Sequence, residues 1–99
     1  MKMEIKQSKS KNKRFTAVFT DNNFKKTIHF GLKNPKIGTY IDHKDKIKRK
    51  NYIARHQVRE KKFYNSPLHA STLSRFILWG EATNLQQAIK DFKQKFKLE

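Results

Sequence analysis

The run KRFTAVFT at residues 13–20 sets the fold class, because its side chains alternate between two faces. Successive positions place Phe, Ala and Phe on one side and Thr, Val and Thr on the other. A period of two in β-branched and aromatic residues predicts a β-strand. The run FKKTIHF at residues 24–30 predicts the return strand, and Asp21-Asn22-Asn23 the turn, since Asn tolerates positive φ. The two runs together predict an antiparallel β-hairpin.

A long basic helix is predicted downstream, over residues 43–62. Asp42 is its expected N-cap, and Asp45 falls in the first turn, where a negative charge favours the helix dipole. On a helical wheel, a narrow stripe indicates a half-buried inner face. The residues of this stripe are Ile47, Asn51, Ala54 and Val58.

Basic residues lie beside that stripe and predict a ridge along nearly the full helix, roughly 27 Å at 1.5 Å per residue. They are Lys44, Lys48, Arg55, Arg59 and Lys62. Residues 43–62 hold nine basic and two acidic residues, and residues 1–14 hold six and one. Clustering of this kind is typical of a binding footprint.

Two further helices are predicted before the C-terminus. Ser66-Pro67 or Ser71 starts the first, whose residues 73–79 are apolar on almost all sides and indicate a buried helix. Thr83 and Gln86 form a T-x-x-Q capping box that starts the second. Apolar residues at helical spacing continue from there to the C-terminus.

The expected architecture is one small α+β domain over residues 13–99, preceded by a flexible basic arm over residues 1–12. Asn34-Pro35 marks a loop after the hairpin. Residues 39–41 either extend the hairpin to a three-stranded antiparallel sheet or stay outside it. Three α-helices then follow the sheet.

The net charge and the absence of Cys limit the classes of partner and of chemistry that the protein can have. The chain has 99 residues, with 24 Lys or Arg against 8 Asp or Glu, and a formal net charge of +16. A compact domain with this excess repels itself, which indicates an anionic partner: DNA, RNA, an anionic membrane or an acidic protein. The sequence has no Cys, which excludes disulfides, thiolate zinc sites and thiol nucleophiles.

Catalytic patterns in the sequence are weak. Four histidines fall on different predicted elements: His29, His43, His56 and His69. A zinc site would need them to converge with a carboxylate.

Glu60-Lys61-Lys62, with Asp42 or Asp45 upstream, matches part of a metal-dependent nuclease pattern, but those acids fall on a predicted helix rather than on adjacent strand ends. Arg75 interrupts an apolar run, where its charge must be paired, reach solvent or contact phosphate. We therefore expect that the protein is not an enzyme and that it binds no cofactor and no metal.

Several sequence blocks together carry a resemblance to a known family. The blocks are Arg14–Phe19, Ile28–Gly31, Tyr40–Asp45, Tyr52–His56 and Leu73–Trp79. They resemble a family of small basic proteins, of unassigned function, that is encoded by large nucleocytoplasmic DNA viruses of protists and algae. The resemblance spans about residues 13–96. It implies a viral setting, with the protein in the virion or in the viral factory of the host cytoplasm, and it transfers no functional residue.

These features predict sequence-independent DNA binding by phosphate neutralisation, and under the resemblance they predict compaction or packaging of a viral genome. The alternatives are an RNA-binding or ribosome-associated module, and a structural virion protein that binds acidic partners. Membrane binding is disfavoured because the basic helix carries a narrow apolar stripe without Trp or Phe. The residues expected to bind nucleic acid are Lys44, Lys48, Arg49, Arg55, Arg59 and Lys62 on the helix, with Lys9, Lys11, Lys13 and Arg14 before it.

Overall fold

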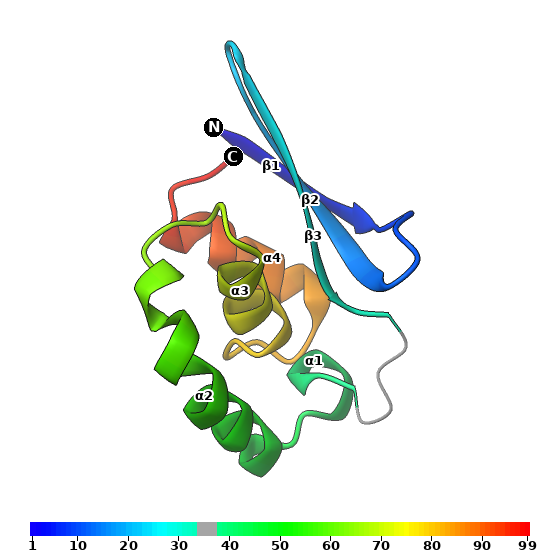
Figure 1. The fold of residues 1–99 in the computed structure, drawn as a ribbon, viewed down its shortest axis with the longest axis vertical. Coiled ribbons are helices and arrows are strands. Elements are labelled where there is room, and N and C mark those ends of the chain that lie inside the picture. The colour runs from blue at the N-terminus through cyan, green and yellow to red at the C-terminus, as the bar shows by residue number, and fades with distance from the viewer. Residues whose placement is uncertain (34–37) are drawn as a thin grey trace.

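A three-stranded antiparallel sheet followed by helices makes up the α+β domain, as predicted. A computed structural model describes residues 1–33 and 38–99, so the loop predicted at Asn34-Pro35 lies outside the described residues. The strands lie side by side in chain order: β1 (Lys2–Gln7), β2 (Lys13–Asp21) and β3 (Phe24–Leu32). The helices pack on one side of this sheet (Figure 1).

The three predicted helices are present with different bounds, and one helical turn that was not predicted, α1 (Tyr40–His43), precedes them. The other helical segments are α2 (Lys46–Glu60), η1 (Lys61–Phe63), α3 (Ala70–Leu73), η2 (Ser74–Leu78) and α4 (Leu85–Lys95). The segment η1 is a 3-10 turn after α2, and η2 continues α3 as a π-helical turn. The N-cap of α4 is Asn84 rather than Thr83, because the Asn84 side chain accepts the backbone N–H of Gln87 at 2.8 Å.

The N-terminal segment is a strand, so the prediction of a flexible arm over residues 1–12 is wrong for residues 2–7. Met3 pairs with Phe19, and Ile5 pairs with Ala17 in the register of β1 against β2. The Met3 side chain is 1% exposed. The third strand of the sheet therefore comes from the N-terminus, and the folded unit begins there rather than at residue 13.

The short strand considered over residues 39–41 is a helical turn instead. Thr39 is the N-cap of α1, and Tyr40 and Ile41 belong to that helix. Tyr40 is buried at its start. This turn places Asp42 next to the sheet, within hydrogen-bond distance of Arg14 on β2.

The core lies between the inner face of the sheet and the helices. Phe15, Ala17 and Phe19 of β2 are buried, as the alternation predicts. The helices contribute buried apolar side chains opposite them: Leu73, Ile77, Leu78, Trp79, Ala88 and Phe92. Backbone hydrogen bonds also join Glu99 to Met1 and Met3, so the two chain ends lie together (Figure 1).

Truncating Met3 tests whether β1 is part of the core. We expect Met3→Ala to lower the free energy of unfolding by about 2–5 kcal/mol, because it empties a fully buried site. For a domain of this size that corresponds to a fall in Tm of about 8 °C or more, measured by circular dichroism. Lys6→Ala, on the exposed side of the same strand, is the control and should change stability by less than about 0.5 kcal/mol. If the Met3→Ala variant were as stable as the control, the N-terminal segment would not be packed in the core, and the prediction of a flexible arm would stand.

Candidate nucleic-acid interface

The basic helix α2 begins later than predicted because Asp45, and not Asp42, is its N-cap. Asp45 Oδ1 accepts the backbone N–H groups of Ile47 and Lys48 at 2.9 and 3.1 Å. The hydrogen bond from Lys48, followed by that from Ile47, holds the pKa of the Asp45 carboxyl below its ordinary value. Lys44 ends α1 in a left-handed conformation, with φ of 58°, so it lies outside α2 and the prediction that it belongs to the ridge is wrong.

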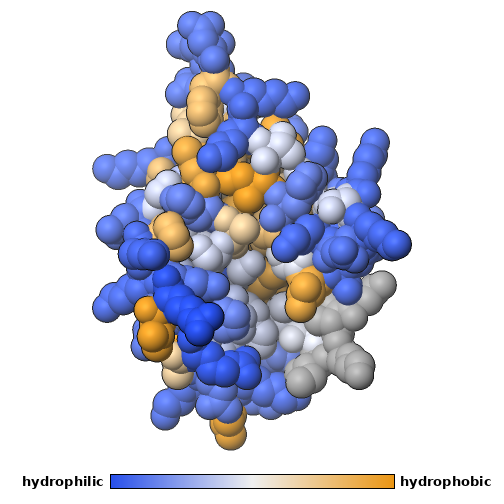
Figure 2. Space-filling view, viewed as in Figure 1, coloured by the Kyte–Doolittle hydropathy of each residue, from blue (hydrophilic) through white to orange (hydrophobic). Residues whose placement is uncertain are grey.

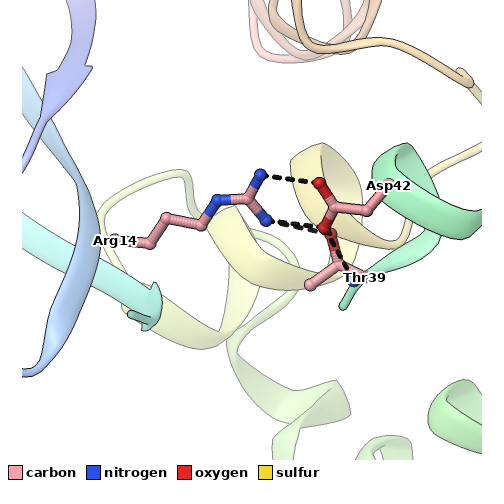
Figure 3. A network of polar contacts seen from close by, with 3 residues as sticks. All are labelled: Arg14, Thr39 and Asp42. Atoms are coloured by element: carbon pink, nitrogen blue, oxygen red, sulfur yellow. Dashed lines mark hydrogen bonds and ion pairs between the residues drawn. The ribbon is translucent and has the colours of Figure 1, made fainter. Parts of the chain in front are cut away.

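Asp42 instead binds Arg14 and joins the sheet to α1 (Figure 3). The two terminal nitrogens of Arg14 donate to the two Asp42 oxygens at 2.7 and 2.8 Å. The backbone N–H and the hydroxyl of Thr39 both donate to Asp42 Oδ2 at 2.8 Å. These contacts, that of Arg14 foremost, hold the pKa of Asp42 well below its usual range. Arg14, predicted to bind nucleic acid, therefore has its charge balanced within the fold.

One face of α2 attaches the helix to the rest of the domain. Its half-buried residues are Arg49, Tyr52, Ile53, His56 and Glu60. The Tyr52 ring stacks on Trp79 with centroids 4.3 Å apart and planes 5° apart, and the His56 ring stacks on Tyr52 at 4.0 Å. Burial raises the pKa of the Tyr52 hydroxyl above its ordinary value. The helix is thus oriented by aromatic stacking at its middle.

Arg49 supplies the second attachment of α2. Its Nε donates to the carbonyl oxygens of Trp79 and Gly80 at 3.2 and 2.8 Å, and Arg75 Nη1 donates to the Trp79 oxygen at 3.1 Å. The chain turns tightly there, since a Cβ on Gly80 would lie 2.4 Å from the carbonyl oxygen of Phe76. Burial, and then the charge of Arg49, lower the pKa of Arg75 below its ordinary value. Arg49 was predicted to bind nucleic acid, but the structure places it on the inner face.

The predicted inner stripe of α2 faces outward, so that prediction is wrong. Ile47 is 73% exposed and Val58 is 83% exposed, and Asn51 and Ala54 between them are exposed too. Figure 2 shows isolated hydrophobic surface over α2, surrounded by hydrophilic side chains. Tyr52 is on the opposite side of the helix and stacks on Trp79, so the aromatic side of α2, and not its aliphatic stripe, packs against the domain.

Basic side chains flank this outer stripe on both sides. We call Ile47, Asn51, Ala54 and Val58 the outer stripe, and Lys48, Arg55 and Arg59 the basic ridge. The ridge residues are all exposed and lie on one side of the helix, as predicted, about 90° around it from the outer stripe. Lys46 and Lys50 are exposed as well and lie about 90° away on the opposite side.

The remaining predicted residues lie outside α2. Lys62 is exposed in η1, and Lys9 and Lys11 are exposed in the connection between β1 and β2. Lys13, at the start of β2, lines a groove of about 420 Å³ together with Arg55 of the basic ridge. The structure therefore brings Lys13 and Arg55 to one groove.

The acidic residues of the predicted nuclease pattern form contacts within the fold and do not gather at one site. Asp45 caps α2, Asp42 pairs with Arg14, and Glu60 lies 3.3 Å from His56 Nδ1 and accepts the Tyr64 hydroxyl at 3.5 Å. Over residues 1–33 and 38–99, three or more His, Cys, Asp or Glu side chains do not gather as a metal site would require. The helices of this same part of the chain are too short or too polar to cross a membrane.

Comparison with known proteins identifies a family and leaves its activity open. Residues 3–56 match the model of a family of unknown function (DUF5754), which is more than half of the chain, and the chain belongs to that family. The matched range runs from β1 through most of α2. No curated protein and no solved structure matches the chain.

The ion pair between Arg14 and Asp42 predicts a defined pH dependence. Because the pKa of Asp42 is lowered in the folded state, its carboxylate stabilises the fold above the unfolded-chain pKa of about 3.9 and loses this effect as the pH falls through the folded-state pKa. We expect Asp42→Asn to be less stable than the wild type at pH 7 by about 1–2 kcal/mol, and the difference to shrink below about pH 4. Urea unfolding followed by the fluorescence of the one Trp measures both values.

Asp91→Asn is the matched control, because this carboxylate is exposed on α4. It should change stability by less than about 0.5 kcal/mol at pH 7. A stability difference between the wild type and Asp42→Asn that stays constant from pH 7 to pH 3 would contradict the assigned ion pair.

Proposed function

We propose that this member of a family of unknown function binds double-stranded DNA through α2, by neutralising backbone phosphates. One observation carries the proposal: the basic ridge is exposed along the helix together with Lys46 and Lys50. Within the described residues, the Arg14 guanidinium pairs with Asp42 and His56 Nδ1 lies 3.3 Å from Glu60, and the ridge takes part in neither contact. Its charges are therefore available to an external anion.

The dimensions of α2 suit a duplex. Fifteen helical residues span about 22 Å, and duplex DNA carries one charge per about 1.7 Å of its axis. Several phosphates thus fall within reach of the ridge and of Lys46 and Lys50. Each phosphate that is neutralised releases condensed counterions, which gives affinity without sequence reading.

The biological role that we propose for this DNA binding is compaction or packaging of a viral genome. It draws its support from the sequence resemblance to proteins of large DNA viruses, and from a net charge of +16 on 99 residues. A protein that coats DNA needs binding that is strong at low salt and tolerant of sequence. Phosphate neutralisation has both properties.

The salt dependence of binding to a random 20-base-pair duplex tests the proposal. We expect affinity to fall by about 10³–10⁵ between 50 and 200 mM salt if roughly 6–10 phosphates are contacted. Replacing Lys48, Arg55 and Arg59 together by Gln should reduce the salt slope by up to about three, because three phosphate contacts are lost. Gln is a good helix former, so the fold should be retained.

The matched control removes the same charge elsewhere. Lys90, Lys93 and Lys97 lie on α4 or directly after it, and their joint replacement by Gln should leave the salt slope within about one unit of the wild type. Equal losses in the two triple variants would mean that bulk charge, and not α2, determines binding. Binding that is insensitive to salt would contradict the whole proposal.

A further inference from the structure

The outer stripe of α2 has a composition that phosphate neutralisation does not use. Three of its members are aliphatic, the fourth is Asn51, and all four are exposed. Ile47 is 73% exposed and Val58 is 83% exposed, so both side chains are accessible to a partner. The stripe lies between two rows of cations, which indicates an anionic partner with apolar or hydrogen-bonding groups between its charges.

We infer that α2 lies in the major groove of B-DNA with the outer stripe on the base edges, and that it prefers A·T base pairs. This inference rests on the proposed DNA binding. An α-helix with its side chains is about 10–12 Å across, and the major groove is about 12 Å wide. The basic ridge and the pair Lys46 and Lys50, each about 90° from the outer stripe, then face the two phosphate backbones that border the groove.

The chemistry of the outer stripe matches an A·T pair. The side-chain amide of Asn51 can accept from adenine N6 and donate to adenine N7 at the same time. Ile47, Ala54 and Val58 offer methyl groups for contact with the C5-methyl of thymine. A G·C pair lacks that methyl group and presents its donor on cytosine, so it satisfies neither contact as well.

Other occupants fit the same surface less well. A second copy of this chain brings another charge of +16 toward the same cations. An in-plane membrane helix is typically rich in Trp, Phe or Leu on its apolar side, whereas the outer stripe offers two large aliphatic side chains. The major groove of A-form RNA is too deep and narrow for a helix.

Two duplexes of equal length, one rich in A·T and one rich in G·C, test the preference at the same salt concentration. We expect the wild type to bind the A·T-rich duplex about five-fold or more tightly, as one good bidentate contact gives. Asn51→Ala should bring the ratio close to one and leave the salt slope unchanged. Gln86→Ala, an exposed residue on α4, is the matched control and should keep the ratio.

Replacing adenine by 7-deazaadenine removes the N7 acceptor and isolates the single contact. The replacement should weaken binding of the wild type and leave Asn51→Ala unaffected. Equal affinity of the wild type for the two duplexes, with a steep salt slope, would overturn this inference and leave the proposed DNA binding intact. Absence of DNA binding at low salt, including the case in which only anionic vesicles are bound, would overturn both.

Discussion

The stacking of Tyr52 on Trp79 determines how the basic helix is presented. Every residue of α2 is exposed or half-buried, so this stack and the hydrogen bonds from Arg49 orient the helix. An aromatic pair contributes about 0.5–1.5 kcal/mol beyond its buried area, and a hydrogen bond from a charged donor about 1.5–3 kcal/mol. Because Tyr52 faces inward, the outer stripe faces solvent, and the basic ridge is held to one side of it.

The distribution of acidic residues explains why cations remain exposed. Asp42, Asp45 and Glu60 are the acids nearest to the basic segment, and each is engaged by a neighbour within the fold. Arg14 and Arg49 likewise serve the fold, one bound to a carboxylate and the other to backbone carbonyls. The structure thus divides the predicted binding residues into two that hold the domain together and others whose charge faces water. A partner that supplies negative charge would relieve the repulsion among the exposed group.

Local periodicity predicted the hairpin because the alternation in residues 13–20 is unambiguous, and it predicted the exposed side of Lys48, Arg55 and Arg59. It missed β1, where only Met3 and Ile5 mark the inner face among charged neighbours. It assigned the wrong face of α2 to the interior, because a helical wheel considers only the residues of that one helix. The deciding partner, Trp79, lies 27 positions from Tyr52 in the sequence, so their stack is a tertiary contact that no local pattern contains.

If α2 lies in the major groove, DNA covers the outer stripe, and chemical protection of that surface reports the contact. The sequence has no Cys, so Ala54→Cys places one thiol on the outer stripe and Gln86→Cys places one on α4. We expect saturating duplex DNA to slow alkylation of the thiol at position 54 by about ten-fold or more at low salt, with the rate recovering at high salt as binding is lost. The thiol at position 86 should react at the same rate with and without DNA. Free reaction of the thiol at position 54, with protection at position 86 instead, would place the DNA over α4 and not over the outer stripe.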